Sequence, residues 1–215
     1  MQIAQEVHQG QPVYALGPKL ADADAAVILA HGRGAAAHDI LQLAQELEQP
    51  GVAFLAPQAA GNTWYPFSFL EPLERNEPGL SSALRVLADL MAEVEAAGIP
   101  AERIVLGGFS QGACLASEFA ARNPRRYGGL LALSGGVIGP PGAPRTVAGS
   151  VEGMPVLVGC SDADPHIPLA RVHETADVFR KLGGDVQLQI YPGMGHVINQ
   201  DEIDRARAIV RAATN

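Results

Sequence analysis

Residues 104–115 read Ile-Val-Leu-Gly-Gly-Phe-Ser-Gln-Gly-Ala-Cys-Leu, and this stretch decides the fold. Its first residues are an apolar run, which is typical of a strand buried on both faces of a parallel sheet. The pattern Gly-x-Ser-x-Gly follows from Gly108 to Gly112, and small residues suited to a helix come next. A strand that turns this sharply into a helix strains the backbone of Ser110 and leaves room only for glycine on either side. We therefore expect Ser110 to stand at the edge of a sheet, above the start of a helix.

Similar apolar runs on both sides of this stretch predict further buried strands. They lie at residues 27–30, 52–56, 130–133 and 156–158, and the alternating run 186–191 predicts a strand with one more exposed face. Helical periodicity predicts helices at about residues 40–47, 80–97, 111–122, 169–182 and 202–212. This alternation favours an α/β fold over residues 1–215 as one domain, with a mostly parallel, doubly wound sheet flanked by helices.

Composition and charge disfavour several classes of partner. The chain has 215 residues and a net charge of −8, without a large cluster of Lys or Arg, so a nucleic acid would be repelled. The acidic field also disfavours an anionic membrane surface, and every apolar run is far too short to cross a bilayer. The first residues do not resemble a signal peptide, and two cysteines do not make a disulfide framework. We expect a cytoplasmic protein that binds neither nucleic acid nor membrane.

A serine that acts as a nucleophile needs a base, and the base needs a carboxylate that orients it. His196 lies just after the predicted strand 186–191, between approaching glycines, and Asp162 and Asp164 lie just after the strand 156–158. The chain order Ser, Asp, His, with each residue at the carboxyl end of a strand, is that of α/β-hydrolases. The pattern predicts Ser110 as nucleophile and His196 as base, with one of the two aspartates as the acid and the other as a loop cap.

Attack on a carbonyl creates an oxyanion, which two backbone N–H groups must stabilise. One donor is the N–H of Gln111, the residue after the serine, and the other is expected from the loop 30–35, Ala-His-Gly-Arg-Gly-Ala. The glycines of that loop do not form either of the common nucleotide-binding patterns. The acidic and histidine residues near Asp164 lack the spacing of a metal site, so neither a metal nor a cofactor is expected.

Taken together, these segments resemble the phospholipase/carboxylesterase family of small α/β-hydrolases, which includes acyl-protein thioesterases and small bacterial carboxylesterases. The marks of the resemblance are His31-Gly-Arg-Gly, Pro57-Gln58, Gly108-Phe-Ser-Gln-Gly, Asp164-Pro-His-Ile-Pro168 and Gly195-His196. The resemblance implies an α/β-hydrolase fold without a cap domain. It selects Asp164 as the acid, because the acid of the family directly precedes a proline. It also assigns the second oxyanion donor to the backbone N–H of Arg33.

The chain departs from the family pattern in two places. The family usually has a hydrophobic residue at the position of Arg33 and a His-Gly pair where Cys160-Ser161 stands. The Arg33 side chain is expected either to bind a polar or anionic substrate or to form a salt bridge in solvent. The aromatic loop with Trp64 and Tyr65 is expected either to line an acyl or aryl pocket or to form a small core that pins the loop.

The residues and the resemblance together imply a serine carboxylesterase that cleaves esters of small soluble molecules through an acyl-enzyme. Within the family, the alternative is an acyl-protein thioesterase or a lysophospholipase. In another class, the alternative is a non-catalytic ligand-binding protein on a hydrolase fold. Residues 135–155 are rich in Gly and Pro and poor in large apolar residues, so we expect no helical lipase lid there.

Overall fold

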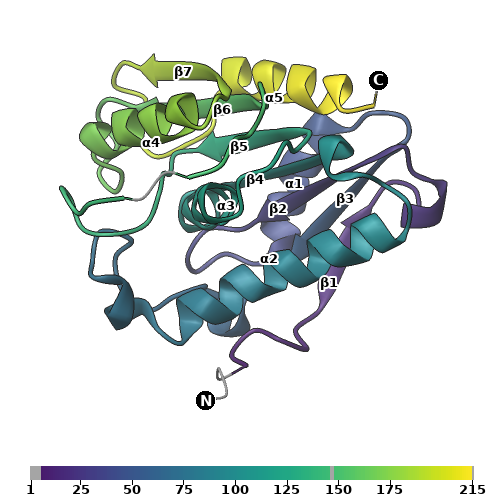
Figure 1. Cartoon of the computed structure of the whole chain (residues 1–215), viewed down its shortest axis with the longest axis horizontal. Coiled ribbons are helices and arrows are strands. Elements are labelled where there is room, and N and C mark those ends of the chain that lie inside the picture. Colours follow the sequence, from purple (N-terminus) through teal and green to yellow (C-terminus); the bar gives the residue numbers. More distant parts are fainter. Residues whose placement is uncertain (1–5, 146–147, 215) are drawn as a thin grey trace.

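The computed structural model describes residues 6–145 and 148–214, and its strands form one sheet in the order β1-β3-β2-β4-β5-β6-β7 (Figure 1). The strands are β1 (Val13–Leu16), β2 (Ala25–Ala30), β3 (Val52–Pro57), β4 (Ile104–Phe109), β5 (Gly129–Leu133), β6 (Pro155–Ser161) and β7 (Asp185–Tyr191). All neighbouring strands run parallel except β1, which pairs with β3 in the antiparallel sense. The mostly parallel, doubly wound sheet predicted from the sequence is confirmed.

Helices cover both faces of the sheet. They are α1 (Ala37–Leu47), α2 (Gly79–Ala96), α3 (Gln111–Arg122), α4 (Leu169–Lys181) and α5 (Gln200–Ala212). Short 3₁₀ turns occur at Leu20–Asp22, Ala60–Asn62, Leu73–Asn76 and Ala101–Arg103. Helices α1 and α5 pack on one face, and α2, α3 and α4 pack on the other. None of the helices in the described ranges combines the length and the hydropathy that a bilayer crossing requires.

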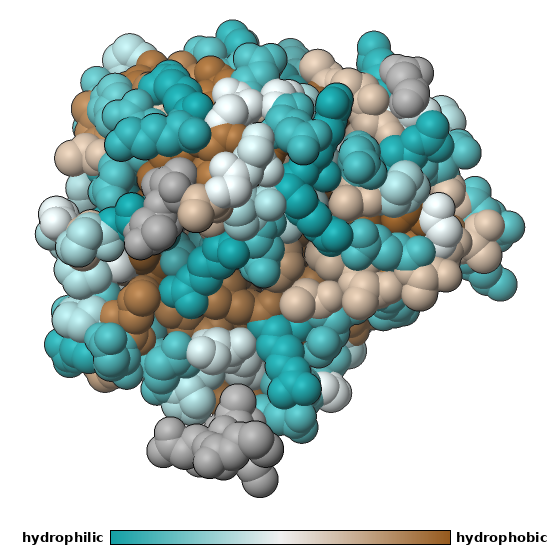
Figure 2. Space-filling model, in the orientation of Figure 1, coloured by the Kyte–Doolittle hydropathy of each residue, from teal (hydrophilic) through white to brown (hydrophobic). Residues whose placement is uncertain are grey.

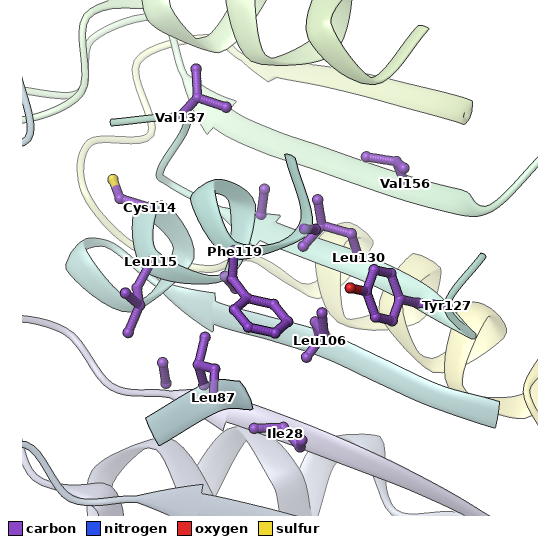
Figure 3. Close-up of a cluster of buried hydrophobic side chains, with 14 of the residues drawn as sticks. Ile28, Leu87, Leu106, Cys114, Leu115, Phe119, Tyr127, Leu130, Val137 and Val156 are labelled. Carbon is purple, nitrogen blue, oxygen red and sulfur yellow. The ribbon is translucent and has the colours of Figure 1, made fainter. Parts of the chain in front are cut away.

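The core lies in two layers, one on each side of the sheet. Figure 3 shows the layer under α3, where Phe119 lies close to Leu106 of the central strand. Phe119 is 5% exposed and Leu106 is fully buried, and burying a side chain of either size contributes roughly 1.5–3 kcal/mol. The face of the molecule seen in the orientation of Figure 1 is mostly hydrophilic, with hydrophobic residues in patches between polar ones (Figure 2). Because a core layer packs on each face of the sheet, the central strands are buried on both faces, and their sequences are uninterrupted apolar runs.

Strand β1 was not among the predicted elements. Its residues Val13–Leu16 alternate between exposed and half-buried, and the strand pairs only with β3 at one edge of the sheet. Four residues of this kind give a weak signal. Helix α1 begins at Ala37, before the predicted position 40, because its first three residues, Ala-His-Asp, include only one apolar residue and so carry little periodicity. The Asp39 carboxylate accepts the Ala36 N–H at 2.7 Å and stabilises this start.

The described part of the loop between β5 and β6 contains no helix. Its first residues are buried, and the side chains of two helices hold them. The Glu118 carboxylate of α3 accepts the Ile138 N–H at 2.8 Å. The Arg171 guanidinium of α4 donates to the Val137 carbonyl at 2.6 Å and to the Gly139 carbonyl at 2.8 Å. This segment is therefore packed down beside the carboxyl edge of the sheet.

Candidate active site

Ser110 occupies the tight turn between β4 and α3. Its backbone angles are φ 56° and ψ −121°, a conformation that costs a non-glycine residue of order 1–3 kcal/mol. A Cβ atom on Gly112 would lie 1.9 Å from the Ala30 carbonyl oxygen, and one on Gly108 would lie 2.4 Å from the same oxygen. Strand β2 therefore approaches the turn so closely that only glycine fits at these two positions. The strained serine is fixed by the packing around it.

His196 and Asp164 reach Ser110 from the ends of two other strands. The Nε2 atom of His196 lies 2.8 Å from Ser110 Oγ, and its Nδ1 atom lies 2.7 Å from Asp164 Oδ2. A carboxylate can only accept, so Nδ1 carries the proton and Nε2 is left to accept the Ser110 hydroxyl. The three side chains thus form one continuous chain of hydrogen bonds.

The Asp164 side chain is fully buried beneath this chain of hydrogen bonds. Burial raises the pKa of its carboxyl group, but hydrogen bonds from His196, His166 N–H and Ile167 N–H outweigh this and hold the pKa below its ordinary value. The two backbone donors lie 2.8 and 3.0 Å from Oδ1, which leaves Oδ2 to His196. Asp164 is therefore ionised and fixed in orientation at neutral pH.

Asp162 lies outside the hydrogen-bonded chain. Its Oδ1 atom accepts the Gly193 N–H at 2.7 Å, at the start of the loop that carries His196. The Ser161 hydroxyl accepts the Gly195 N–H of the same loop at 3.1 Å. These two side chains hold the histidine loop against the end of β6. In the sequence, Ser161 stands out only as part of the Cys160-Ser161 departure from the family pattern, and its hold on the histidine loop was not predicted.

The loop after β2 lies directly against the serine turn. A Cβ on Gly32 would come within 3.5 Å of Ser110 Cβ, so the loop and the turn face one another at close range. His31 stiffens the loop, because its Nε2 accepts the Ala59 N–H at 3.1 Å and its Nδ1 donates to the Gly32 carbonyl at 2.8 Å. Burial lowers the pKa of His31 and favours this neutral form. Gln111 begins α3, so its backbone N–H has no partner within the helix.

The Arg33 side chain connects the loop after β2 to the aromatic loop. Its guanidinium donates to the Pro66 carbonyl at 2.8 Å and to the Phe67 carbonyl at 2.6 Å. The partners given by the structure are carbonyl oxygens, which corrects the expectation of a salt bridge in solvent. The side chain is exposed and lines the mouth of the cleft described below.

Trp64 and Tyr65 take different positions. Trp64 is fully buried and does not line the cleft, and its Nε1–H donates to the His31 carbonyl at 2.9 Å. This corrects the expectation that Trp64 binds substrate and fits the alternative of a small core that pins the loop. A buried indole needs a partner for its N–H, and the His31 carbonyl is that partner. Tyr65 does line the cleft. The Gln111 side chain holds both residues, accepting the Trp64 N–H at 3.0 Å and donating to the Tyr65 carbonyl at 2.9 Å.

A cleft of about 510 Å³ opens over Ser110. Its lining is mostly apolar, with a few polar groups close to the serine, and comprises Gly32, Arg33, Ala35, Tyr65, Pro66, Phe67, Ser68, Phe69, Phe109, Ser110, Gln111, Cys114, His166, Ile167 and His196. The centre of the Phe109 ring lies 4.7 Å from that of the His196 ring. The His166 ring contacts the His196 ring edge-on, with 4.8 Å between the two ring centres. Nothing in the sequence pattern selects Phe109, and the position of His166 beside His196 was not predicted. Within the described residues, no group of three or more His, Cys, Asp or Glu side chains is arranged to hold a metal.

Comparisons with known proteins point to one family. The chain is 40% identical to a phospholipase/carboxylesterase from Dyadobacter fermentans of known crystal structure, with a TM-score of 0.91 over 97% of this chain and 99% of that one. It is 32% identical to acyl-protein thioesterase 1 of Gibberella zeae over 66% of this chain, although the match spans only 62% of that protein. It is 28% identical to acyl-protein thioesterase 1 of Neurospora crassa over 88% of this chain and 86% of that one. The model of the Phospholipase/Carboxylesterase family matches residues 16–213, and the chain belongs to this family.

Proposed function

We propose that the chain is a serine carboxylesterase that hydrolyses esters of small soluble molecules through an acyl-enzyme. The observation that carries this proposal is the hydrogen-bonded chain from Asp164 through His196 to Ser110, at the edge of a mostly apolar cleft. A protein that only binds a ligand has no need of the buried Asp164, whose second oxygen orients the histidine. The family relationship supports the same reaction type.

In the first half of the reaction, Ser110 Oγ attacks the ester carbonyl carbon while His196 Nε2 takes the hydroxyl proton. The carbonyl electron pair moves onto oxygen, and the backbone N–H groups of Arg33 and Gln111 stabilise that oxyanion. The oxyanion then collapses, the carbon–oxygen bond to the alcohol breaks, and His196 gives its proton to the departing oxygen. Asp164 keeps the histidine in the required tautomer throughout.

In the second half, a water molecule takes the place of the alcohol. His196 removes a proton from the water, the resulting hydroxide attacks the acyl carbon, and the same two N–H groups stabilise the second oxyanion. Collapse of this intermediate releases the carboxylic acid and returns the proton to Ser110. Each step uses only groups of this chain, the ester and water.

The test is labelling with a fluorophosphonate together with hydrolysis of p-nitrophenyl butyrate. The wild-type protein should be labelled in a one-to-one ratio and should turn the ester over. Ser110→Ala should prevent labelling and lower kcat by about 10⁶. Ser117→Ala is the matched control, because Ser117 is a fully buried serine of α3 outside the cleft. An unlabelled wild-type protein that hydrolyses no ester would instead favour a ligand-binding protein on a hydrolase fold.

An acyl-protein thioesterase is the second candidate, because the relatives from Gibberella and Neurospora carry that name. The same attack and collapse would cleave a thioester, with sulfur as the departing atom. Matched oxygen esters and thioesters with one acyl chain separate the two candidates by their kcat/KM values. A lysophospholipid and an S-palmitoylated peptide belong in the same assay, since hydrolysis of either would change the substrate class.

We further propose that the enzyme acts in the cytoplasm. Cys114 and Cys160 are both buried and unpaired, which suits a reducing compartment. Fractionation of cells that express a tagged chain at its natural level measures this directly. Recovery of the protein in a membrane or secreted fraction would contradict it.

A further inference from the structure

A second groove adjoins the cleft on the far side of Gly32 and Phe109. Its volume is about 360 Å³, and it shares Gly32, Ala35 and Phe109 with the cleft over Ser110. The rest of its lining comes from the loop after β2, from α1, and from α5 and the segment before it: His31, Asp39, Ile40, Gln42, Leu43, Glu46, Ile198 and Ile203. The groove and the cleft therefore meet beside the serine turn.

The groove meets the cleft on the side of His196. The Phe109 ring, which borders both spaces, packs against the His196 ring at 4.7 Å, and Ile198 follows His196 by two residues. During acylation, the departing oxygen must lie close to His196 Nε2, because it receives its proton there. The chain attached to that oxygen consequently has the groove as its nearest apolar surface. The part of the cleft lining that the groove does not share, which includes Phe69 and Cys114, is left for the acyl chain.

We propose that this groove binds the alcohol part of the ester, and that it selects alcohols that are apolar and carry no negative charge. The proposal rests on the esterase function proposed above and names the substrate class of that site. Acyl transfer proceeds as already written: the carbon–oxygen bond breaks, its electron pair stays on the alcohol oxygen, and the His196 proton goes to that oxygen. The released alcohol then leaves along the groove.

The lining gives the apolar preference. Ile40 and Leu43 of α1 line the groove together with Ile198, Ile203 and Phe109, and all five belong to or pack against one hydrophobic cluster. Ile40 and Leu43 keep only 6% and 7% of their surface exposed, so the wall that they form belongs to the packed core. An alkyl group in this groove replaces water against a fixed apolar surface.

The charges of the rim give the second preference. Asp39 and Glu46 line the groove, and no Lys or Arg is among its described lining residues. The Asp39 carboxylate accepts the Ala36 N–H at 2.7 Å. The Arg207 guanidinium lies 4.0 Å from the Glu46 carboxylate. A carboxylate or phosphate on the alcohol would meet these acidic groups in a protein whose net charge is −8. We therefore expect the groove to bind leaving groups that carry a carboxylate or a phosphate less well than uncharged ones.

The experiment uses n-alkyl acetates from methyl to octyl with the wild-type enzyme. Primary alcohols have similar acidity, so the series changes only the length of the leaving group. We expect kcat/KM to rise about two- to fourfold per methylene until the groove is filled. All members form the same acetyl-enzyme, so kcat should approach one common value when deacylation is slow. An acetate of an ω-hydroxy acid should have a kcat/KM at least tenfold below that of the alkyl acetate of equal length.

Gln42→Trp and Gln45→Trp are the matched variants. Both glutamines are exposed on α1, but only Gln42 lines the groove. A tryptophan at position 42 should obstruct the groove, so that the ratio of kcat/KM for hexyl acetate to that for methyl acetate falls about tenfold or more. The Gln45→Trp enzyme should keep the wild-type ratio. Methyl esters of increasing acyl length should keep their wild-type ranking in both variants.

Three results would contradict the assignment in distinguishable ways. A flat alkyl acetate series, or an unchanged ratio in Gln42→Trp, would remove the groove from the reaction and leave the esterase intact. A changed acyl ranking in Gln42→Trp would assign the groove to the acyl chain instead. Failure to hydrolyse any ester would overturn the proposed function itself, and the role of the groove with it.

Discussion

Asp162 and Asp164 lie two residues apart, and the groups that their oxygens accept give them different roles. Asp164 accepts two backbone N–H groups through Oδ1 and His196 through Oδ2, whereas Asp162 accepts the Gly193 N–H. The distinction was not readable from the residues alone, because both aspartates follow the same strand. The proline after Asp164 separated them through the family resemblance, and the hydrogen bonds give the physical reason.

Asp164→Asn should therefore cost far more activity than Asp162→Asn. An amide opposite Nδ1 stabilises the wrong histidine tautomer, and the same change in a protease triad lowers kcat by roughly 10⁴. Asn at position 162 still offers an oxygen to Gly193, so its kcat should stay within about tenfold of wild type. Steady-state kinetics on both purified variants with one p-nitrophenyl ester measure the ranking. The opposite ranking would make Asp162 the acid.

At the scale of elements, Arg33 binds one loop to another. Its guanidinium spans two carbonyls of the aromatic loop, while its backbone N–H is the proposed oxyanion donor. Arg33→Ala keeps that N–H but releases the aromatic loop, so the loss in kcat should be well below the 10²–10³ that removal of a true donor costs. Arg33→Lys should behave like Arg33→Ala, because an ammonium group does not span two carbonyls as a planar fork does.

The readout for Arg33 is the separation of kcat from KM. A released loop should raise KM for large acyl groups more than it lowers kcat, because Tyr65 and Phe67 on that loop line the cleft. If kcat fell by the full 10²–10³ in both variants, the side chain itself would act on the reacting atoms. If only carboxylate-bearing substrates lost activity, Arg33 would be a specificity residue for anionic acyl groups.

The start of α5 makes stability depend on pH. Glu202 is fully buried there, its Oε2 accepts the Asn199 N–H at 2.9 Å, and its Oε1 is without a hydrogen-bond partner among the described residues. Burial raises the pKa of Glu202 from 4.5 to about 7. Between these values the folded protein holds a proton that the unfolded chain has lost, so the free energy of unfolding falls as pH rises from about 4.5 to about 7.

Glu202→Gln should remove that dependence. Gln keeps an oxygen that can accept the Asn199 N–H, and it carries no charge at any pH. Above pH 7, the free energy of unfolding of the variant should therefore exceed that of the wild type by on the order of 2–3 kcal/mol. Urea unfolding of both proteins at pH 5 and pH 8 measures the difference. The difference in free energy of unfolding between the two proteins could instead be equal at pH 5 and pH 8. That result would show that the Glu202 carboxyl group of the folded protein is already ionised at pH 5.

The elements that could be predicted from the sequence are those whose signal is local. The central strands are apolar on both faces, and α3 has the predicted bounds because the glycine pattern fixes its start and its small residues continue it. Strand β1 was missed, and the choice between a pocket and a small core for Trp64 stayed open, for a common reason. Both depend on contacts with distant segments, β3 in one case and His31 with Gln111 in the other. Sequence spacing carries no record of such contacts.

At the scale of the whole molecule, the cleft over Ser110 and the groove beside it both lie at the carboxyl edge of the sheet. The loop between β5 and β6 is held down by Glu118 and Arg171, and its described part forms no helix over the serine. The cleft over Ser110 is consequently reached from water. Its lining includes Phe69 and Cys114, which are 8% and 1% exposed and belong to the packed core. We therefore expect a substrate that is dissolved as a monomer, with an acyl chain whose length these buried residues limit.

Short acyl chains, of about two to eight carbons, should accordingly be preferred over long ones. In p-nitrophenyl esters, log(kcat/KM) should rise by about 0.6 per buried methylene and then level off where the chain meets these buried residues. Phe69→Ala should move this limit to longer chains, whereas Phe67→Ala, at a side chain that is 45% exposed, should leave it in place. The rate should also pass smoothly through the critical micelle concentration of the longer esters, because no lipid surface is needed to expose the serine. A continuous rise as far as the palmitoyl ester, or activation by micelles, would show that the cleft continues past Phe69, and would favour an acyl-protein thioesterase or a lipase over an esterase of small molecules.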